Sequence, residues 1–296
     1  MKRNMMNTLF LDQVMNGNVE DFWYHLGISN REPFLERMKD LRAVVVAGSG
    51  DRIRRMAHEW ASRKNIAEAD MIHFPKEERF VIYYVGGVLF CSHGMGMPSA
   101  SIAIQELMKL VFFVKGGIEA EMDRVFWCRV GTSGGLCNPG DVIVTTEGLM
   151  SDFKPYRLIA LGKETSFDSK FPENICEEII AANEGTGINV IKGKTIGGNS
   201  FYIEQNRVDG AVCLATEAEK MEWLQKAFDL GVRNIEMEAP MIAGFLNHWG
   251  FSRFATICCA LVNRMEGDQV TATPAQLGQY SLNAEAALWN YLEKTV

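Results

Sequence analysis

The chain has 296 residues, of which 47% are hydrophobic and 23% are charged, and its formal net charge is −7 at pH 7. This length allows one large α/β domain or two small ones, and the composition is that of an ordinary globular protein. The acidic balance argues against nucleic acid or an acidic membrane surface as the main partner, so any anion site would need a local cluster of arginines.

The seven cysteines form no Cys-x-x-Cys pair and do not combine with histidines at zinc-ligand spacing. They are typical of reduced thiols in a cytosolic protein. The N-terminus, MKRNMMNTLF, lacks a sustained apolar segment, and no apolar run approaches the roughly 18 residues that a membrane helix needs. We therefore expect a cytoplasmic protein with no membrane partner.

The first forty residues are polar and mixed, and a helix is expected over residues 33–40. His25 precedes it, and a lone histidine in such a segment is more often structural or solvated than functional. The stretch AVVVAGSGDRIRR that follows predicts a buried strand at 43–47, a glycine turn at 48–50 and an amphipathic helix from Asp51. This order suits a phosphate at a helix N-terminus.

The glycine turn does not match the common nucleotide motifs. It contains no Gly-Lys-Ser/Thr, and Ile53 stands where a dinucleotide fingerprint has its third glycine. Arg52 would project from the first helical turn, where an arginine is usually only solvated. Alone, this signal is weak.

Arg79 precedes two predicted strands, 81–85 and 88–92, which Gly86-Gly87 joins as a hairpin turn. A second glycine loop at 94–96 then leads into a helix opened by Pro98. Its expected apolar side carries Ile102, Leu107 and Leu110.

A concentrated set of hydrogen-bond donors lies in FWCRVGTSGGLCNPGDVIVTTE, residues 126–147. We predict a buried strand at 125–130, a glycine-rich loop at 131–135, and a second strand at 141–146 after a turn. Arg129 lies inside the apolar run, and a buried arginine costs several kcal/mol unless it is paired. Thr132 and Ser133 follow it. Either an anion site or a tight turn with an internally paired arginine explains this stretch.

The second half alternates in the same way, with a polar and aromatic segment, GGNSFYIEQNRVDGA, in its middle. A strand carrying Glu236 meets a helix that starts near Pro240, a favourable first-turn residue. The other predicted elements are helices at 172–183, 217–230 and 274–293, and strands at 188–195, 234–237 and 254–262.

Alternating helices and apolar strands predict a mostly parallel or mixed sheet covered on both faces. No linker, composition shift or repeat divides the chain, so we predict an α/β fold: one domain over residues 1–296 with a central mixed β-sheet flanked by helices. Ligands bind at the carboxyl ends of strands in such folds. The groups that fall there are Gly48, Gly94, Arg129–Gly135, Glu236–Glu238 and Asn263-Arg264.

With these motifs placed, the sequence resembles the nucleoside phosphorylase superfamily, in particular its animal uridine phosphorylases. The match keeps order and spacing from about His25 to the last helix. It is carried by Gly48–Arg52, SHGMGMPS at 92–99, RVGTSGG at 129–135, FYIEQNRVDG at 201–210, NIEME at 234–238 and NRMEGDQ at 263–269. Six motifs in register are far more specific than any one of them.

The resemblance implies the nucleoside phosphorylase fold and the reversible cleavage of uridine by inorganic phosphate, giving uracil and ribose 1-phosphate in pyrimidine salvage or catabolism. Phosphate is then a co-substrate, and no cofactor, metal or covalent nucleophile is expected. The resemblance also implies a homodimer with shared active sites, to which residues 1–40 contribute. No nucleic acid is expected as a partner.

The site residues implied by the resemblance fall into three groups. The phosphate site would consist of Gly48, Arg52, Arg129 and Thr132, with Arg79 supplied by the neighbouring subunit. The uracil site would consist of Phe201, Gln205, Arg207 and Arg264. The ribose site would consist of Met237 and Glu238, with His25 reaching across the dimer to the 5′-hydroxyl. Arg129, Thr132, Arg207 and Glu238 would be the catalytic residues.

The chemistry of these side chains suits those roles. As phosphate attacks C1′, the sugar becomes oxocarbenium-like and uracil leaves with negative charge. Glu238 can favour the positive ring, Gln205 can offer one donor and one acceptor to a uracil edge, and Arg207 can stabilise the leaving base. Purine-cleaving relatives usually have Asp where Asn263 stands, so a pyrimidine is favoured.

Three departures from the family pattern are Gly50 in the first turn, Ile203-Glu204 beside the base-reading glutamine, and Ala239-Pro240 after the ribose carboxylate. We expect them to tune affinity or flexibility. Three rival hypotheses are a non-catalytic nucleoside-binding paralogue, a hydrolase that uses water, and a dinucleotide-dependent oxidoreductase. The last rests only on Gly48–Gly50.

Overall fold

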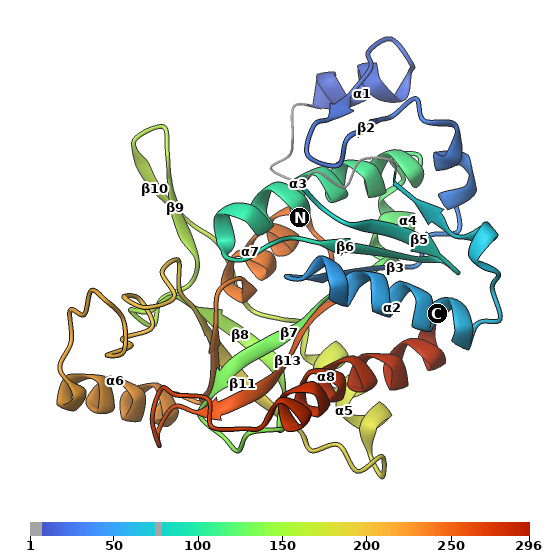
Figure 1. Ribbon diagram of the computed structural model, residues 1–296. Coiled ribbons are helices and arrows are strands. Elements are labelled where there is room, and N and C mark those ends of the chain that lie inside the picture. Colours follow the sequence, from blue (N-terminus) through green and yellow to red (C-terminus); the bar gives the residue numbers. More distant parts are fainter. Residues whose placement is uncertain (1–7, 75–78) are drawn as a thin grey trace. The chain divides into compact units, whose positions relative to one another are not determined.

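The computed structural model describes residues 8–74 and 79–296 (Figure 1). The chain forms two compact units, and the strand β7 (Phe126–Gly135) runs through the boundary between them. The first unit consists of the described residues up to Cys128 together with His248–Arg253. The second consists of Arg129–Asn247 and Phe254–Thr295.

The first unit is built on four sheet strands in the order β3-β6-β5-β4. The neighbouring strands β3 and β6 are parallel, and both are buried along their whole length. The helix α2 packs on β3, β5 and β6 with one apolar face. The elements are α1 (Thr8–Met15), β1 (Phe22–Trp23), β2 (Ile28–Ser29), η1 (Pro33–Met38), β3 (Ala43–Ala47), α2 (Gly50–Arg63), η2 (Glu68–Asp70), β4 (Ile72–His73), β5 (Ile82–Val85), β6 (Val88–Ser92), α3 (Met97–Val114) and α4 (Glu119–Asp123).

Among the described residues, one helix, α3, is both long and strongly apolar. Its 18 residues have a mean hydropathy of 1.3, so it is long and apolar enough to cross a membrane, contrary to the sequence-based expectation. Half of the helix is buried inside the protein, and a buried core helix meets the same two criteria. Ile102 was expected on its apolar side but is exposed, whereas Leu107 and Leu110 are buried.

The second unit contains a closed ring of strands. The order is β12-β11-β8-β13-β7, and β12 also pairs with β7, which completes the ring. β11 is parallel to both β8 and β12, whereas β13 is antiparallel to β8, so the sheet is mixed. The elements are β7, β8 (Val142–Leu149), β9 (Arg157–Ala160), β10 (Lys163–Ser166), α5 (Glu173–Asn183), β11 (Val190–Gly197), α6 (Glu217–Asp229), β12 (Val232–Glu236), α7 (Ala239–Trp249), β13 (Phe254–Asn263) and α8 (Pro274–Thr295).

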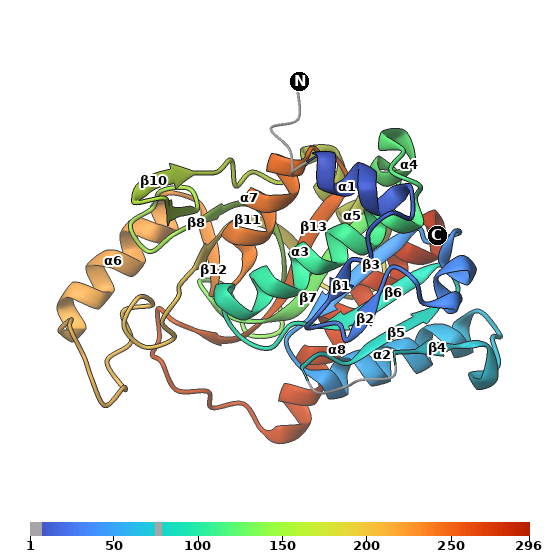
Figure 2. The same ribbon diagram turned by 90° about the horizontal axis from the view of Figure 1, so that it is seen from above.

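Helices cover this ring from several sides. α5 and α8 pack against each other and against β8 and β13. α6 packs on β12 through an apolar cluster that includes Leu224, Val232 and Ile235. The segment between β11 and α6 is irregular, and it forms the loop seen beside α6 in Figure 2. The predicted α/β class, with a mixed sheet flanked by helices, is confirmed.

The predicted glycine loop at 131–135 is wrong, because these residues continue β7. Gly134 and Gly135 pair with Ile235 and Asn234 of β12. A Cβ on Gly135 would lie 2.7 Å from the Cβ of Ala260, so the glycine permits close strand packing and forms no turn.

Two smaller differences concern exposed segments. The helix expected at 33–40 is the short 3-10 helix η1. The β9–β10 hairpin, which the sequence pattern did not indicate, projects from its unit (Figure 1). All four residues of β10 are exposed, so no apolar alternation marks this strand.

Candidate active site

Arg129 lies on β7 and is buried, with 6% of its surface exposed. Its Nη2 contacts the carboxylate of Glu238 and lies 3.2 Å from Oε2 of Glu236. Its Nη1 lies 2.6 Å from Sγ of Cys258 on β13. The internally paired arginine expected as one alternative is therefore present, and binding of phosphate by Arg129 stays a prediction.

Glu236 ends β12 and organises the start of α7. Its carboxylate accepts hydrogen bonds from the backbone N–H groups of Glu238, at 2.9 Å, and of Ala239, at 2.8 Å. Burial raises the pKa of Glu236 to about 7; Arg129 opposes the shift, and the neighbouring Glu238 adds to it. Sequence reasoning assigned a role only to Glu238. The acidic pair in NIEME was the available signal for Glu236.

Met237 and Glu238, the predicted ribose residues, follow the end of β12 directly; that they bind ribose stays a prediction. Glu238 is 3% exposed, whereas Met237 is half-buried. On the neighbouring β7, Thr132 is also half-buried. This junction therefore carries an acidic group and an arginine against each other, an arrangement that can orient hydroxyl groups and an anion.

A chain of buried polar side chains holds β12 beside β7. The Asn234 amide donates to the Ser133 hydroxyl at 3.0 Å, and its Oδ1 accepts from the Thr195 hydroxyl at 2.6 Å. Thr195 in turn contacts the hydroxyl of Thr145 at 2.7 Å. Because buried polar groups are costly when unpaired, this chain favours one register for the strand ends that carry Thr132 and Glu236.

Gln205 is almost fully buried, at 3% exposed, although it belongs to an irregular loop. Its amide nitrogen lies 3.3 Å from the backbone oxygen of Glu236, so this predicted uracil-reading residue lies at the end of β12, which the predicted ribose residues Met237 and Glu238 follow in the sequence. The adjacent Glu204 accepts a hydrogen bond from the backbone N–H of Asn199 at 2.7 Å. The unusual carboxylate is thus used within the loop itself.

Arg207 lies on the same loop. Its guanidinium lies 4.6 Å from the centre of the Phe201 ring, and it donates to both carboxylate oxygens of Asp209, at 2.9 and 2.6 Å. These hydrogen bonds lower the pKa of Asp209. The predicted pair Phe201 and Arg207 is therefore brought together, and Phe201 remains 44% exposed.

Arg264 follows the end of β13 and is fully buried. It donates to Asp268 through Nε, at 2.6 Å, and to the backbone oxygen of Gln205 through Nη2, at 2.9 Å. The structure thus gathers three of the four predicted uracil residues, Gln205, Arg207 and Arg264, around the loop that contains Asp268. Sequence reasoning gave Asp268 no role, although it belongs to NRMEGDQ.

In the first unit, the two predicted glycine turns are adjacent. The backbone N–H of His93 donates to Ala47 at 2.8 Å, and a Cβ on Gly48 would lie 2.8 Å from the carbonyl oxygen of Gly94. Gly48 therefore has no room for a side chain. A Cβ on Gly50 would lie equally close to Val81, which gives a local reason for glycine at this departure from the family pattern.

Arg52 is half-buried in the first turn of α2, and its backbone N–H lies 3.4 Å from the hydroxyl of the N-cap residue Ser49. Arg79 is exposed just before β5 and adjoins residues 75–78, which lie outside the described part of the chain. That Gly48, Arg52 and Arg79 bind one phosphate together with Arg129 and Thr132 stays a prediction.

His25 lies in the first unit and contacts Glu106 of α3. The ring Nδ1 lies 2.7 Å from Oε1 of Glu106, and the same carboxylate accepts the backbone N–H groups of His25 and Leu26. About a third of the His25 side chain, 32%, is exposed. The ring is therefore held on one side and accessible on the other, as a contact with a hydroxyl would require.

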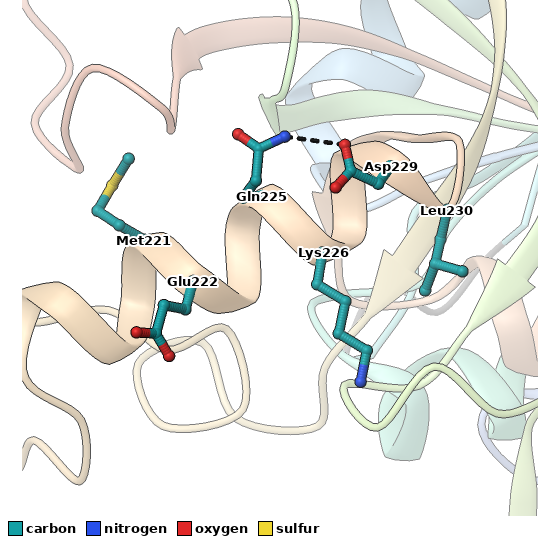
Figure 3. A pocket seen from close by; sticks show the side chains of 6 residues that line it. All are labelled: Met221, Glu222, Gln225, Lys226, Asp229 and Leu230. Atoms are coloured by element: carbon teal, nitrogen blue, oxygen red, sulfur yellow. Dashed lines mark hydrogen bonds between the residues drawn. The ribbon is translucent and has the colours of Figure 1, made fainter.

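A surface pocket in the second unit carries none of the predicted residues. It is lined along α6 by Met221, Glu222, Gln225, Lys226, Asp229 and Leu230 (Figure 3). Gln225 donates to Asp229 at 2.8 Å, which is an ordinary pair on a helix surface.

Comparison with known proteins decides which family this arrangement belongs to. The family model described as the phosphorylase superfamily matches residues 42–293. The chain belongs to the phosphorylase superfamily. Uridine phosphorylase A of Schistosoma mansoni is 33% identical over 280 residues, which cover 93% of this chain and 92% of the relative.

Two further similarities bear on activity and ligands. Inactive uridine phosphorylase B of the same organism is 31% identical over 93% of this chain and 92% of its own. The crystal structure of Schistosoma mansoni uridine phosphorylase in complex with thymidine has a TM-score of 0.88 and 31% identity, and the match covers 98% of this chain and 97% of that one. The resemblance to the nucleoside phosphorylases is therefore confirmed. That residues 1–296 act as a single catalytic domain stays a prediction.

Proposed function

We propose that this phosphorylase-superfamily protein is a uridine phosphorylase, which cleaves uridine reversibly with inorganic phosphate to give uracil and ribose 1-phosphate. The observation that carries the proposal is the buried group of Arg129, Glu236 and Glu238, with Gln205 beside it, in a chain related over nearly its whole length to uridine phosphorylases. The thymidine complex of a relative supports a nucleoside as ligand.

The ribose side supplies a negative charge whose stabilising effect grows along the reaction. As the glycosidic bond lengthens, positive charge develops on the sugar ring, and the carboxylate of Glu238 favours it. The same carboxylate can accept hydrogen bonds from ribose hydroxyl groups. Because the site is buried, such electrostatic stabilisation acts with little screening by water.

The base side stabilises the leaving group. Gln205 offers an amide N–H and a carbonyl, which match the adjacent acceptor and donor on one edge of uracil. Arg207 lies on the same loop and can donate to a base oxygen as negative charge spreads onto it. This division of roles needs side chains that position and polarise and no covalent intermediate.

Arg52, Arg79 and Arg129, with the backbone at Gly48 and the hydroxyl of Thr132, would hold the attacking phosphate. Each charge-assisted hydrogen bond contributes about 1.5–3 kcal/mol.

We propose that the protein is a homodimer in which the partner subunit supplies Arg79 and His25. We keep the predictions that no cofactor is required and that the protein is cytoplasmic. All seven cysteines lie within the described residues and none forms a disulfide, which supports a reducing compartment.

A second candidate is a non-catalytic protein that binds nucleosides, and the relative named an inactive uridine phosphorylase favours keeping it. Assays of uridine, deoxyuridine, thymidine and inosine, each with and without phosphate, separate the candidates. Release of uracil from uridine only with phosphate supports the proposal. Tight uridine binding in calorimetry without turnover would support the second candidate, and release without phosphate would indicate a hydrolase.

A further inference from the structure

Asp268 lies in the loop after β13 and contacts both arginines of the predicted base site, Arg207 and Arg264. Asp268 is buried, with 6% of its surface exposed. Its carboxylate accepts from Arg264 Nε at 2.6 Å, and it lies 3.3 Å from the backbone nitrogen of Val208 and 3.3 Å from Nζ of Lys220. Its backbone carbonyl accepts from Arg207 Nη2 at 3.1 Å. One residue thus joins two arginines of the base site.

The contact with Arg264 fixes the direction of a fully buried guanidinium. Asp268 occupies Nε, and the backbone carbonyl of Gln205 occupies Nη2. Within the described chain, Nη1 has no hydrogen-bond partner, although it is buried. Burial lowers the pKa of Arg264 and Asp268 opposes that shift, so the carboxylate helps to keep the guanidinium charged. Nη1 remains as the donor that can act on a ligand.

The chain from Asp268 to Arg264 also reaches Gln205 itself. Arg264 contacts the backbone of Gln205, whose side chain is buried against Glu236. The carboxylate of Asp268 also contacts the backbone nitrogen of Val208, the residue that follows Arg207 in the sequence. The loop that carries both base-reading side chains is therefore anchored at two points by one aspartate.

Arg207 shows why such an anchor matters. Asp209 binds its Nε and Nη2, and the Asp209 side chain is 21% exposed, compared with 3% for Asp268. The more exposed pair is the weaker constraint, because water screens it and competes for its hydrogen bonds. The buried aspartate supplies the constraint that the surface pair does not.

We propose that Asp268 is a positioning residue for recognition of the pyrimidine base: it holds Arg264 and the backbone at 205–208 so that Gln205, Arg207 and Arg264 meet the base together. The inference rests on the proposed function, since it concerns the same site. Asp268 acts through these neighbours and does not itself contact the base.

The test compares Asp268→Asn with Asp141→Asn. Asp141 is a matched control because it is 9% exposed and accepts hydrogen bonds from Asn138 and Asn189, none of which belongs to the predicted site. In Asp268→Asn, the new amide would keep the shape of the carboxylate but direct an N–H₂ group toward Arg264 or toward Val208 and Lys220, all of which are donors. We expect the uridine KM and the uracil Kd to rise about tenfold, the loss of one charged hydrogen bond.

The difference between the effects on the uridine KM and on the phosphate KM distinguishes a positioning role from general support of the fold. Asp268→Asn should leave the phosphate KM within about twofold of the wild-type value. Asp141→Asn should leave both the uridine KM and the phosphate KM within about twofold of the wild-type values. In an Arg264→Met background, Asp268→Asn should change the uridine KM far less, because coupled residues are not additive. The inference would be contradicted if Asp268→Asn raised the uridine KM as much in the Arg264→Met background as in the wild type. It would also be contradicted if Asp268→Asn raised the uridine KM and the phosphate KM equally.

Asp268→Glu keeps the charge and displaces the carboxylate by one methylene. We expect it to raise the uridine KM several-fold, and it replaces Asp268→Asn if the latter does not fold. A wild-type protein that binds uracil in calorimetry but does not turn over uridine would contradict the proposed function alone. Equal uracil Kd values in wild type and both Asp268 variants, or no uracil binding by wild type, would overturn the role of Asp268.

Discussion

Arg129 and Arg207 lie in the same unit but are held in different ways. Arg129 is 6% exposed on a strand, between β12 and β13, with two buried carboxylates. Arg207 lies on an irregular loop and depends on Asp209 and an exposed aromatic ring. We infer that the sugar side is built from strands and the base side from side-chain pairs. Changes on the sugar side should therefore lower kcat, whereas changes on the base side should raise the uridine KM.

The largest effect is expected for Glu238→Gln. It removes the negative charge that favours an oxocarbenium-like sugar and leaves Arg129 with one fewer charged partner. We expect kcat to fall about a hundredfold, comparable to the loss of one preorganised electrostatic contact. Steady-state kinetics measures it, with the exposed Glu222→Gln as control. An unchanged kcat in Glu238→Gln would remove this residue from catalysis.

Gln205→Leu should have the next largest effect, on the base side. Without its donor and acceptor, a buried uracil edge is left unpaired, so we expect kcat/KM for uridine to fall about thirtyfold. Circular dichroism should show an intact fold. The matched control is Gln225→Leu on α6, where the glutamine contacts only Asp229 among the residues drawn (Figure 3). If Gln205→Leu retains the wild-type kcat/KM, uracil is not read by this side chain.

The pH dependence of stability tests the strand-built side. The pKa of Glu236 is raised from 4.5 to about 7, chiefly by burial, so the folded state binds more protons than the unfolded state between these values. The contribution of Glu236 to stability is therefore full below about 4.5 and is lost as the pH rises toward 7. Urea unfolding at a series of pH values gives the free energy of unfolding of the wild type and of Glu236→Gln. Between pH 4.5 and 7 we expect the wild type to lose more stability than the variant. Equal pH dependence of the two free energies would contradict the raised pKa of Glu236.

The smallest effect is expected for Phe201→Ala, which removes the ring over Arg207. An exposed cation–π contact is worth about 0.5–1 kcal/mol, so the uridine KM should rise about threefold with kcat unchanged. Phe228→Ala is a close control, because Phe228 stacks with Arg233 and is 39% exposed, near the 44% of Phe201. A fall in kcat for Phe201→Ala, without a rise in the uridine KM, would contradict the assignment of KM effects to the base side and kcat effects to the sugar side.

Elements that depend on local pattern could be predicted from the sequence. The strand at 43–47, the hairpin with Gly86-Gly87 and the helix beginning at Glu217 were found within a residue or two. Each has a short-range signal: an apolar run, two glycines with positive φ, or a capping box at Thr216. Local signals of this kind do not depend on distant partners.

Features set by long-range pairing could not be predicted in this way. Gly131–Gly135 has the composition of a turn, and only pairing with β12 makes it a strand. Glu236 and Asp268 also have distant partners, Arg129 for Glu236 and Val208 with Lys220 for Asp268, which no local pattern indicates. The roles predicted for Arg129, Glu238, Gln205 and Arg264 came from the family resemblance, because no spacing rule connects these residues.

The most direct test of the account measures both products of uridine cleavage at several phosphate concentrations. Uracil can be followed by absorbance, and ribose 1-phosphate by phosphorus NMR, in the same reaction. We predict that uracil and ribose 1-phosphate form in equal amounts and that the rate rises with phosphate until it saturates. Formation of free ribose at a rate independent of phosphate, or no uracil above the blank, would contradict the account.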